Sequence, residues 1–243
     1  MDLAGRVAAL LDAAGLDLRG ALACASYDAQ VPSAWQSSRL LPDARSALVV
    51  GSGGRALWRA ARASGALATA ADPLDAHTER ALAACVAALR DADVAAVAVF
   101  AHERRGDAYA DFVALGQAAG LGAPSRLGLL VHPVYGPWLS LRAVLLSRLA
   151  WPAGGPLAGF EPCRGCPAPC ASACHGDAVG PSGFVVPRCA AARAGDPRCA
   201  SRCDARHACV LGQEHAYVAE AEAHHMRSVL PREALLESGR TRT

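Results

Sequence analysis

Apolar residues recur at helical spacing in four segments of the chain, which predicts four helices. The longest expected helix covers residues 72–92, where Asp72 can cap the N-terminus and Pro73 suits the first turn. Leu82, Val86 and Leu89 form its predicted buried stripe. The other three segments are residues 3–15, 111–119 and 215–229.

Short uninterrupted apolar runs predict buried strands at residues 21–27, 46–50, 94–100, 127–132 and 139–146. The last two runs are joined by residues 133–138, which predicts a hairpin. Strands mixed with helices and a hairpin indicate an α+β sheet rather than a strictly alternating parallel one. Gly51–Gly54 follows the second run and is expected to be either a plain tight turn or a turn that approaches a phosphate.

A segment rich in proline and glycine, residues 151–159, predicts a boundary between two parts of the chain. We expect a first domain over residues 1–150, a cysteine-rich domain over residues 160–212, and a terminal helix and tail over residues 213–243. More than half of the residues are apolar, which is ample for a packed core.

The charge pattern narrows the expected partners. The chain contains 24 arginines and no lysine, and its formal net charge is only +2. A GC-rich genome explains this arginine content, and there is no basic block, so nucleic acid is not an expected partner. The chain has neither an apolar run long enough for a membrane helix nor a signal-peptide pattern, so we expect a cytoplasmic protein without a membrane partner.

Cysteine supplies the candidate chemistry. Eight of the ten cysteines lie between positions 163 and 209. Thiols this close together, in a compartment where disulfides are disfavoured, usually bind a metal or do redox work. Eight thiolates can hold two 4Fe-4S clusters. One cluster with spare thiols, a zinc site, disulfides and plain buried thiols are the alternatives. The candidate ligands are Cys163, Cys166, Cys170, Cys174, Cys189, Cys199, Cys203 and Cys209.

Two stretches carry a family resemblance. The block from Ala119 to Arg142, with its Gly-Leu-Gly and Tyr-Gly-Pro-Trp segments, and the order of the eight cysteines resemble epoxyqueuosine reductase, the cobalamin-dependent reductive dehalogenases and the cobalamin C-type decyanase. Residues 41–51 fit the same pattern. The resemblance implies a nitroreductase-like mixed sheet with flanking helices that holds cobalamin. It also implies a small ferredoxin-like cysteine domain that carries one or two 4Fe-4S clusters.

The implied activity is reductive. Electrons from a flavoprotein or a ferredoxin would pass through the clusters to cobalamin, and then to a small molecule or to the corrinoid itself. The alternatives are a cobalamin-processing chaperone without clusters and a non-enzymatic electron-transfer or zinc-binding protein. FMN could also occupy the place of the corrin. We do not expect a C-terminal repeat region like that of the tRNA-modifying enzymes.

The cysteine spacing departs from the bacterial ferredoxin pattern. One extra residue separates Cys166 from Cys170, and His175 stands where that pattern has proline. The gaps that separate Cys199, Cys203 and Cys209 are also looser. One extra residue can bulge out of a loop that binds a cluster, but several altered gaps between the ligands of one site are harder to accommodate.

The resemblance also implies cofactor contacts. The segment from His132 to Trp138 would line the corrin face, with Tyr135 and Trp138 as walls and His132 near cobalt. Its alternative is a tight turn packed by aromatic rings, with a structural histidine. Arg126 and Arg142 could hold the cofactor tail, with Ser125 as a further donor, or could be surface arginines.

The resemblance also implies a proton donor. Asp107 lies roughly where the tRNA-modifying enzymes have one, with Asp111 as a competitor, and this role requires a buried carboxyl group.

Overall fold

The computed structural model describes residues 2–68 and 72–227. These residues divide into two compact units. The first unit contains the residues up to 122 together with residues 139–158, and the second contains residues 123–138 together with those from 159 onward. Within the described residues, no helix is both long enough and apolar enough to cross a membrane.

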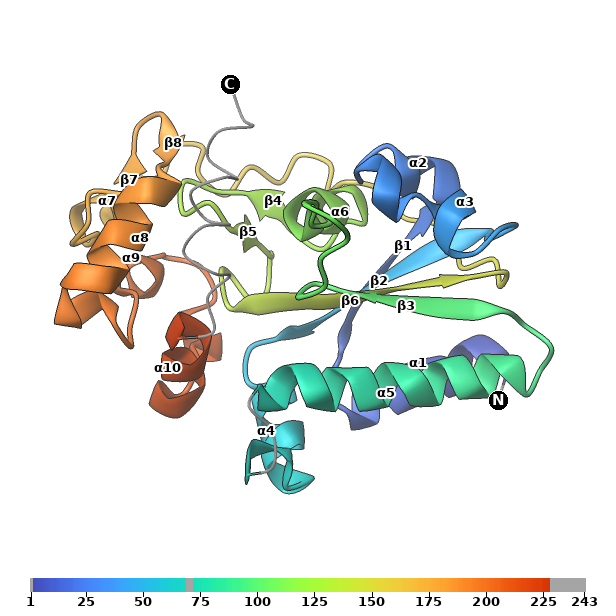
Figure 1. Ribbon diagram of the computed structural model, residues 1–243. Coiled ribbons are helices and arrows are strands. Elements are labelled where there is room, and N and C mark those ends of the chain that lie inside the picture. The colour runs from blue at the N-terminus through green and yellow to red at the C-terminus, as the bar shows by residue number, and fades with distance from the viewer. Residues whose placement is uncertain (1, 69–71, 228–243) are drawn as a thin grey trace. The chain divides into compact units, whose positions relative to one another are not determined.

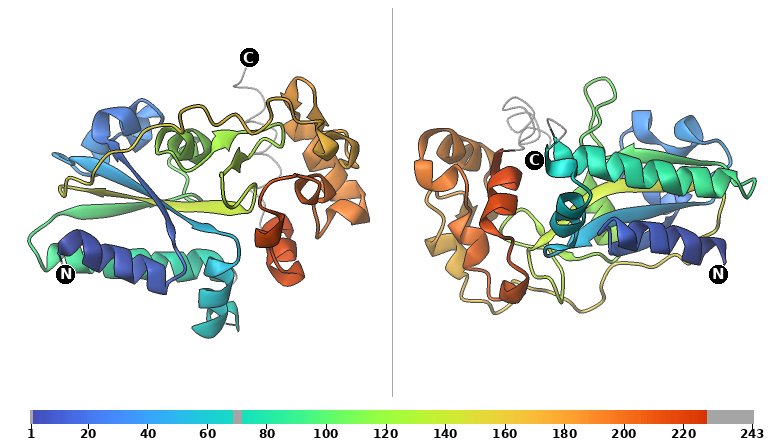
Figure 2. Two further views of the ribbon diagram at one scale, coloured as in Figure 1. Left: turned by 180° about the vertical axis from the view of Figure 1, so that it is seen from behind. Right: turned by 90° about the horizontal axis from the view of Figure 1, so that it is seen from below.

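The first unit is built on a four-stranded antiparallel sheet with the strand order β1-β2-β6-β3 (Figure 1). Helices α1 and α5 lie on one face of the sheet, and α2, α3 and α6 lie on the other (Figures 1 and 2). Every residue of β2 is buried, as expected for a strand covered on both faces. The strands are β1 (Leu18–Ala23), β2 (Ser46–Gly53), β3 (Ala96–Phe100) and β6 (Leu139–Ser147).

Three of the predicted helices are confirmed in this unit, and each has an aspartate cap. Asp2 caps α1 (Leu3–Ala13), Asp72 caps α5 (Pro73–Arg90), and Asp111 caps α6 (Phe112–Ala118). A carboxylate at this position accepts backbone N–H groups that the helix leaves unpaired. The remaining helices are α2 (Cys24–Asp28), η1 (Ser33–Trp35), α3 (Ser37–Leu40), α4 (Ala56–Ala63) and η2 (Ala66–Ala68).

Two local predictions are wrong. The expected strand over residues 21–27 ends at Ala23, where α2 begins. The first three residues of the expected glycine turn, Gly51 to Gly53, are part of β2, which has a bulge between Val50 and Gly51. A Cβ at Gly51 would lie 2.5 Å from the carbonyl oxygen of Ser140, so this glycine permits close pairing with β6.

The predicted hairpin between residues 127–132 and 139–146 is also wrong. Both edges of β6 pair with other strands, β2 and β3, so no edge remains for the preceding run. That run supplies only β5 (Leu130–Val131), which pairs with β4 (Ala123–Pro124). The turn between these segments closes on itself, because His132 and Gly136 exchange two backbone hydrogen bonds.

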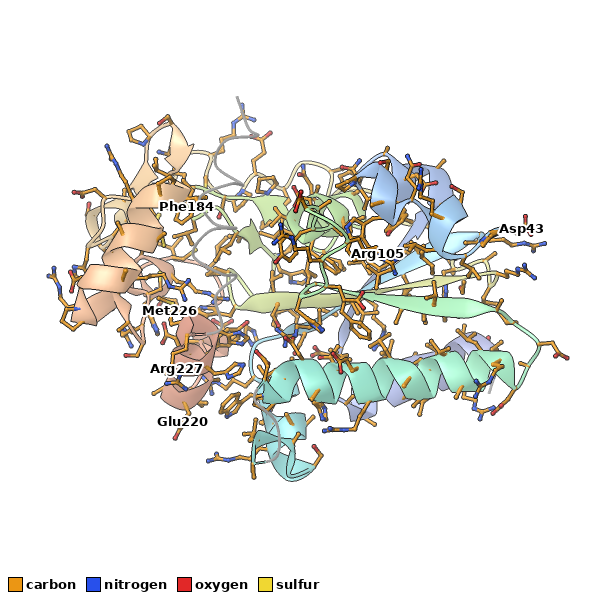
Figure 3. The ribbon with its side chains drawn as sticks, in the orientation of Figure 1. Asp43, Arg105, Phe184, Glu220, Met226 and Arg227 are labelled. Atoms are coloured by element: carbon orange, nitrogen blue, oxygen red, sulfur yellow. The ribbon has the colours of Figure 1, made fainter. Side chains whose placement is uncertain are left out.

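The second unit consists of short elements around a small core, which contains Leu127, Cys170, Val179 and Ala205. Gly128 has a φ of +70°, and a Cβ there would lie 2.5 Å from the ring of Phe184, which Figure 3 labels. The helices are α7 (Pro169–Ser172), α8 (Val186–Gly195), η3 (Pro197–Cys199), α9 (Asp204–His207), η4 (Gln213–His215) and α10 (Ala219–Arg227). The strands besides β4 and β5 are β7 (Val179–Gly180) and β8 (Gly183–Phe184).

The second unit contains a segment besides the cysteine region, and the expected domain bounds stay a prediction. Residues 123–138, which the sequence suggested as part of the first domain, belong with the second unit. The last predicted helix begins at Ala219 rather than at position 215, and its expected end at residues 228–229 lies outside the described residues.

Candidate redox centre

All ten cysteines are free thiols, and the eight in the second unit form two groups of four. Cys170 interacts electrostatically with the other members of the first thiol group. Cys189 does the same in the second thiol group. The first thiol group is Cys163, Cys166, Cys170 and Cys209, and the second is Cys174, Cys189, Cys199 and Cys203.

The two groups do not follow the order of the sequence. Cys174 closes the first run of cysteines but belongs to the second thiol group, whereas Cys209, the last of the eight, belongs to the first. In ferredoxins with two clusters, the fourth cysteine of the sequence run likewise ligates the other cluster. The altered spacing of this chain is therefore compatible with the crossed pairing of a two-cluster centre.

Short helices hold the thiols in place. Helix α7 carries the buried Cys170, α8 carries Cys189, and η3 ends at Cys199. Cys203 precedes the first residue of α9, and the side chains of Cys203, Cys209 and Cys174 pack against the small core of the unit. The same apolar contacts that form this core thus bring distant cysteines together.

Burial raises the pKa of Cys170, Cys189, Cys199, Cys203 and Cys209, and the neighbouring thiols raise it further. These groups therefore hold their protons more tightly than an ordinary cysteine. A metal ligand must be a thiolate, so filling the centre would release protons.

Backbone N–H groups donate to sulfur in both thiol groups. Arg126 N–H donates to Cys163 Sγ at 3.4 Å, and Ala178 N–H donates to Cys174 Sγ at 3.3 Å. The backbone N–H groups of Leu211 and Arg206 also donate to Cys209 and Cys203, and lower the pKa of these two thiols. Hydrogen bonds of this kind stabilise a thiolate and adjust the potential of an iron–sulfur cluster.

The described residues contain no set of three or more histidine, cysteine or acidic side chains close enough to hold a single metal ion. Zinc needs four ligands about 2.0–2.3 Å from one ion. A 4Fe-4S cluster instead takes its four thiolates at four different iron atoms, so its ligands stand further apart.

Several predicted cofactor contacts already have partners within the protein. Ser125 Oγ donates to the carbonyl oxygen of Leu129 at 2.8 Å, and His132 Nδ1 accepts the N–H of Val134 at 3.1 Å. The ring of Tyr135 lies 5.1 Å from the ring of His132. Ser125 thus helps to close the turn that ends at Leu129, and His132 and Tyr135 help to close the turn that ends at Gly136, so contact of these residues with a corrin stays a prediction.

Trp138 lies inside an aromatic cluster of the second unit and is only 1% exposed. Its ring meets those of His207 and Tyr217 edge-on at 4.8 and 5.4 Å. The guanidinium of Arg206 lies 4.7 Å from the centre of the Trp138 ring and 4.6 Å from that of Tyr217. These contacts support the packing interpretation of Trp138.

Arg142 and Asp107 belong to the first unit and not to the thiol centre. Arg142 Nη2 donates to Asp75 Oδ1 at 2.8 Å, and His102 Nδ1 lies 3.3 Å from the same oxygen. Asp107 is fully exposed and pairs with Arg104 at 2.8 Å. Its competitor Asp111 caps α6. The roles expected for Arg142 and Asp107 stay predictions.

Two charged residues near the thiols were missed at the sequence level. Glu222, only 3% exposed, accepts the N–H of Cys203 at 3.0 Å and lies 2.8 Å from His207 Nε2. Arg193 faces the second thiol group from α8. Its spacing of four residues from Cys189 was a usable signal, because such residues share a helix face. No local pattern indicates Glu222.

No protein-family model matches the chain, and no curated protein matches it significantly. Solved structures do. A crystal structure of epoxyqueuosine reductase with a tRNA stem loop matches with a TM-score of 0.61 and 14% identity, over 91% of this chain and 67% of that chain. The B12-trafficking protein CblC of C. elegans matches with a TM-score of 0.59 and 15% identity, over 99% and 98% of the two chains.

A reductive dehalogenase structure, described as suggesting a mechanism for B12-dependent dehalogenation, matches with a TM-score of 0.53 and 16% identity. The match covers 88% of this chain but 34% of the dehalogenase. The predicted α+β, nitroreductase-like fold is confirmed. The chain has the fold shared by epoxyqueuosine reductase, CblC and reductive dehalogenase, as its sequence resemblance suggested.

Proposed function

We propose that this protein is an iron–sulfur redox protein that delivers single electrons to a corrinoid. Its two thiol groups would each hold one 4Fe-4S cluster, and a flavoprotein or a ferredoxin would be the electron donor. The corrinoid would then serve a reductive reaction, either on a small molecule or on its own cobalt. Such a protein would work in the cytoplasm, where the thiols stay reduced.

The observation that carries this proposal is the crossed division of eight thiols into two groups of four. Cysteines that were buried by chance would not be expected to form two groups of equal size. Nor would they be expected to place Cys209 in the first thiol group and Cys174 in the second. When bound, the clusters would supply one-electron chemistry, which no side chain of the chain provides. The protein itself contributes burial of the thiols and the N–H donors of Arg126 and Ala178.

The corrinoid part of the proposal rests on the fold and not on individual contacts. The names of the similar structures mention B12 for two of the three proteins described above. In this chain, Trp138 is buried and Arg142 forms an ion pair with Asp75, so neither side chain is available to contact a cofactor in this structure. FMN is the alternative cofactor for this fold.

A second function is a cobalamin-processing chaperone without clusters. The match to the B12-trafficking protein favours it, because 99% of this chain and 98% of that chain are covered. The match to epoxyqueuosine reductase leaves about a third of that enzyme uncovered.

Metal analysis and a cobalamin titration separate these functions. The protein would be purified under argon from iron-replete cells, its iron, sulfide and zinc quantified, and its absorbance followed as cob(II)alamin is added. We expect about eight iron atoms per chain, from two 4Fe-4S clusters, together with a corrin spectral shift. A corrin shift without iron would support the chaperone. Zinc without corrin binding would support a non-enzymatic zinc protein and contradict both.

RNA binding also needs a direct test. The near-neutral charge led us to expect no nucleic-acid partner, yet one similar structure was solved with a tRNA stem loop. The comparisons therefore do not support that expectation. Gel-shift titration of the cluster-loaded protein with a tRNA stem loop, against a scrambled hairpin, would decide between RNA and a small substrate.

A further inference from the structure

Helix α8 places a cysteine and an arginine on one face. Cys189 and Arg193 are four residues apart within this helix, so their side chains project in the same direction. The helix packs tightly against the turn that follows Cys174, because a Cβ at Gly176 would lie only 2.5 Å from the Cβ of Ala192. Glycine at position 176 thus lets α8 approach the second thiol group.

The side chain of Arg193 is half-buried, and no described residue forms an ion pair with it. Its Nη2 atom is shielded from solvent, and no described residue accepts a hydrogen bond from it. Burial lowers the pKa of Arg193, whereas the neighbouring thiols of Cys189, Cys203 and Cys199 raise it. An unpaired buried cation is costly, and a neutral thiol does not offset that cost. An anion at the second thiol group would offset it.

The other charged groups near this thiol group have partners. Arg206, whose charge lowers the pKa of the Cys203 thiol, donates a hydrogen bond to the carbonyl oxygen of Pro137. Glu222 pairs with His207. Asp196 and Arg198, beside Cys199, pair with each other.

No arginine charge contributes to the pKa shifts of Cys170 and Cys209 in the first thiol group. Among the described residues, Arg193 is the one arginine with a buried side-chain nitrogen that has no hydrogen-bond partner.

We propose that Arg193 is a built-in counter-cation for an anionic cluster on the second thiol group, and that it makes this cluster the easier of the two to reduce. The inference rests on the proposed function, because it requires both clusters. Reduction transfers one electron from the donor protein to the cluster and adds one negative charge. A buried cation nearby stabilises that added charge more than an exposed cation would, because water screens it less.

The test is an EPR-monitored redox titration of the anaerobically reconstituted protein and three variants. Arg193→Gln removes the charge, Arg193→Lys retains it, and Arg188→Gln removes an exposed charge from the same helix. A Cys174→Ala variant identifies which signal belongs to the second thiol group. Iron and sulfide per chain are measured for every sample.

In Arg193→Gln, we expect the reduced-to-oxidised ratio of the second cluster to fall about tenfold at the parent's midpoint potential. This corresponds to about 59 mV for one electron. The first cluster and the Arg188→Gln protein should keep the parent's potentials, and Arg193→Lys should shift less. Loss of the second cluster in Arg193→Gln but not in Arg193→Lys would also support the inference.

Unchanged potentials in Arg193→Gln would overturn the inference, as would an equal shift in Arg188→Gln. Loss of the second cluster in both Arg193 variants would also overturn it, since packing rather than charge would then be at work. A parent protein that takes up no iron would overturn the proposed function and this inference together. An iron-loaded parent with unshifted variants would overturn only the inference.

Discussion

The thiol of Cys170 interacts with the thiol of Cys209, although all four members of the second thiol group lie between them in the sequence. Cys174, only four positions after Cys170, faces Cys203 instead. Pairing in space therefore contradicts proximity in sequence, and this relationship can be tested directly.

Double cysteine variants distinguish crossed from sequential pairing. Cys170→Ala with Cys209→Ala removes two ligands from one group, so we expect about half of the parent's iron to remain. Cys170→Ala with Cys174→Ala damages both groups and should remove nearly all of it. Iron and sulfide per chain, with EPR of the reduced protein, give the answer. Sequential pairing would reverse the two results.

Metal uptake by the apoprotein should become stronger as pH rises. Burial raises the pKa of five candidate ligands, so at neutral pH their protons compete with the metal. We expect the Co²⁺ affinity, measured by its thiolate absorbance, to increase between about pH 6 and pH 8, with protons released into the solution. Affinity independent of pH over this range would show that the thiols are already ionised.

Cys85 should make the first unit less stable at alkaline pH. Burial raises the pKa of this thiol from 9.0 to about 11, so the folded state holds a proton that the unfolded state loses. The stabilisation, about 3 kcal/mol, is complete below pH 9 and is lost as pH rises through 11. Urea unfolding of the parent and of Cys85→Ala at several pH values measures the slope. Equal slopes in the two proteins would contradict the prediction.

Gly136 should be required for assembly of the second unit. Its φ is +56°, and a Cβ there would lie within van der Waals overlap of the Leu211 carbonyl oxygen. We expect Gly136→Ala to lower the iron content and the unfolding temperature strongly. Gly159→Ala is the control, because its φ is +71° but its surroundings are open, so only backbone strain of about 1 kcal/mol applies. Equal effects would show that the close contact is unimportant.

Several helices and strands of the first unit could be predicted from the sequence because their causes are local. Asp72 and Pro73 mark the start of α5, and the apolar run from Ser46 marks β2. The strand partners could not be predicted in this way. β6 pairs with β2 and β3 rather than with the run that precedes it, because hydrogen bonding between strands depends on which edges are open.

The sequence alone determined that eight clustered thiols exist and that the fold is α+β. Only the tertiary structure decided how the thiols divide, because packing around Cys170 and Ala205 brings Cys209 back to the first run of cysteines. It also decided that Trp138 is buried and that Arg193 has no counter-ion among the described residues. Burial and charge pairing depend on neighbours that are distant in the chain, so the spacing of residues along the sequence does not predict them.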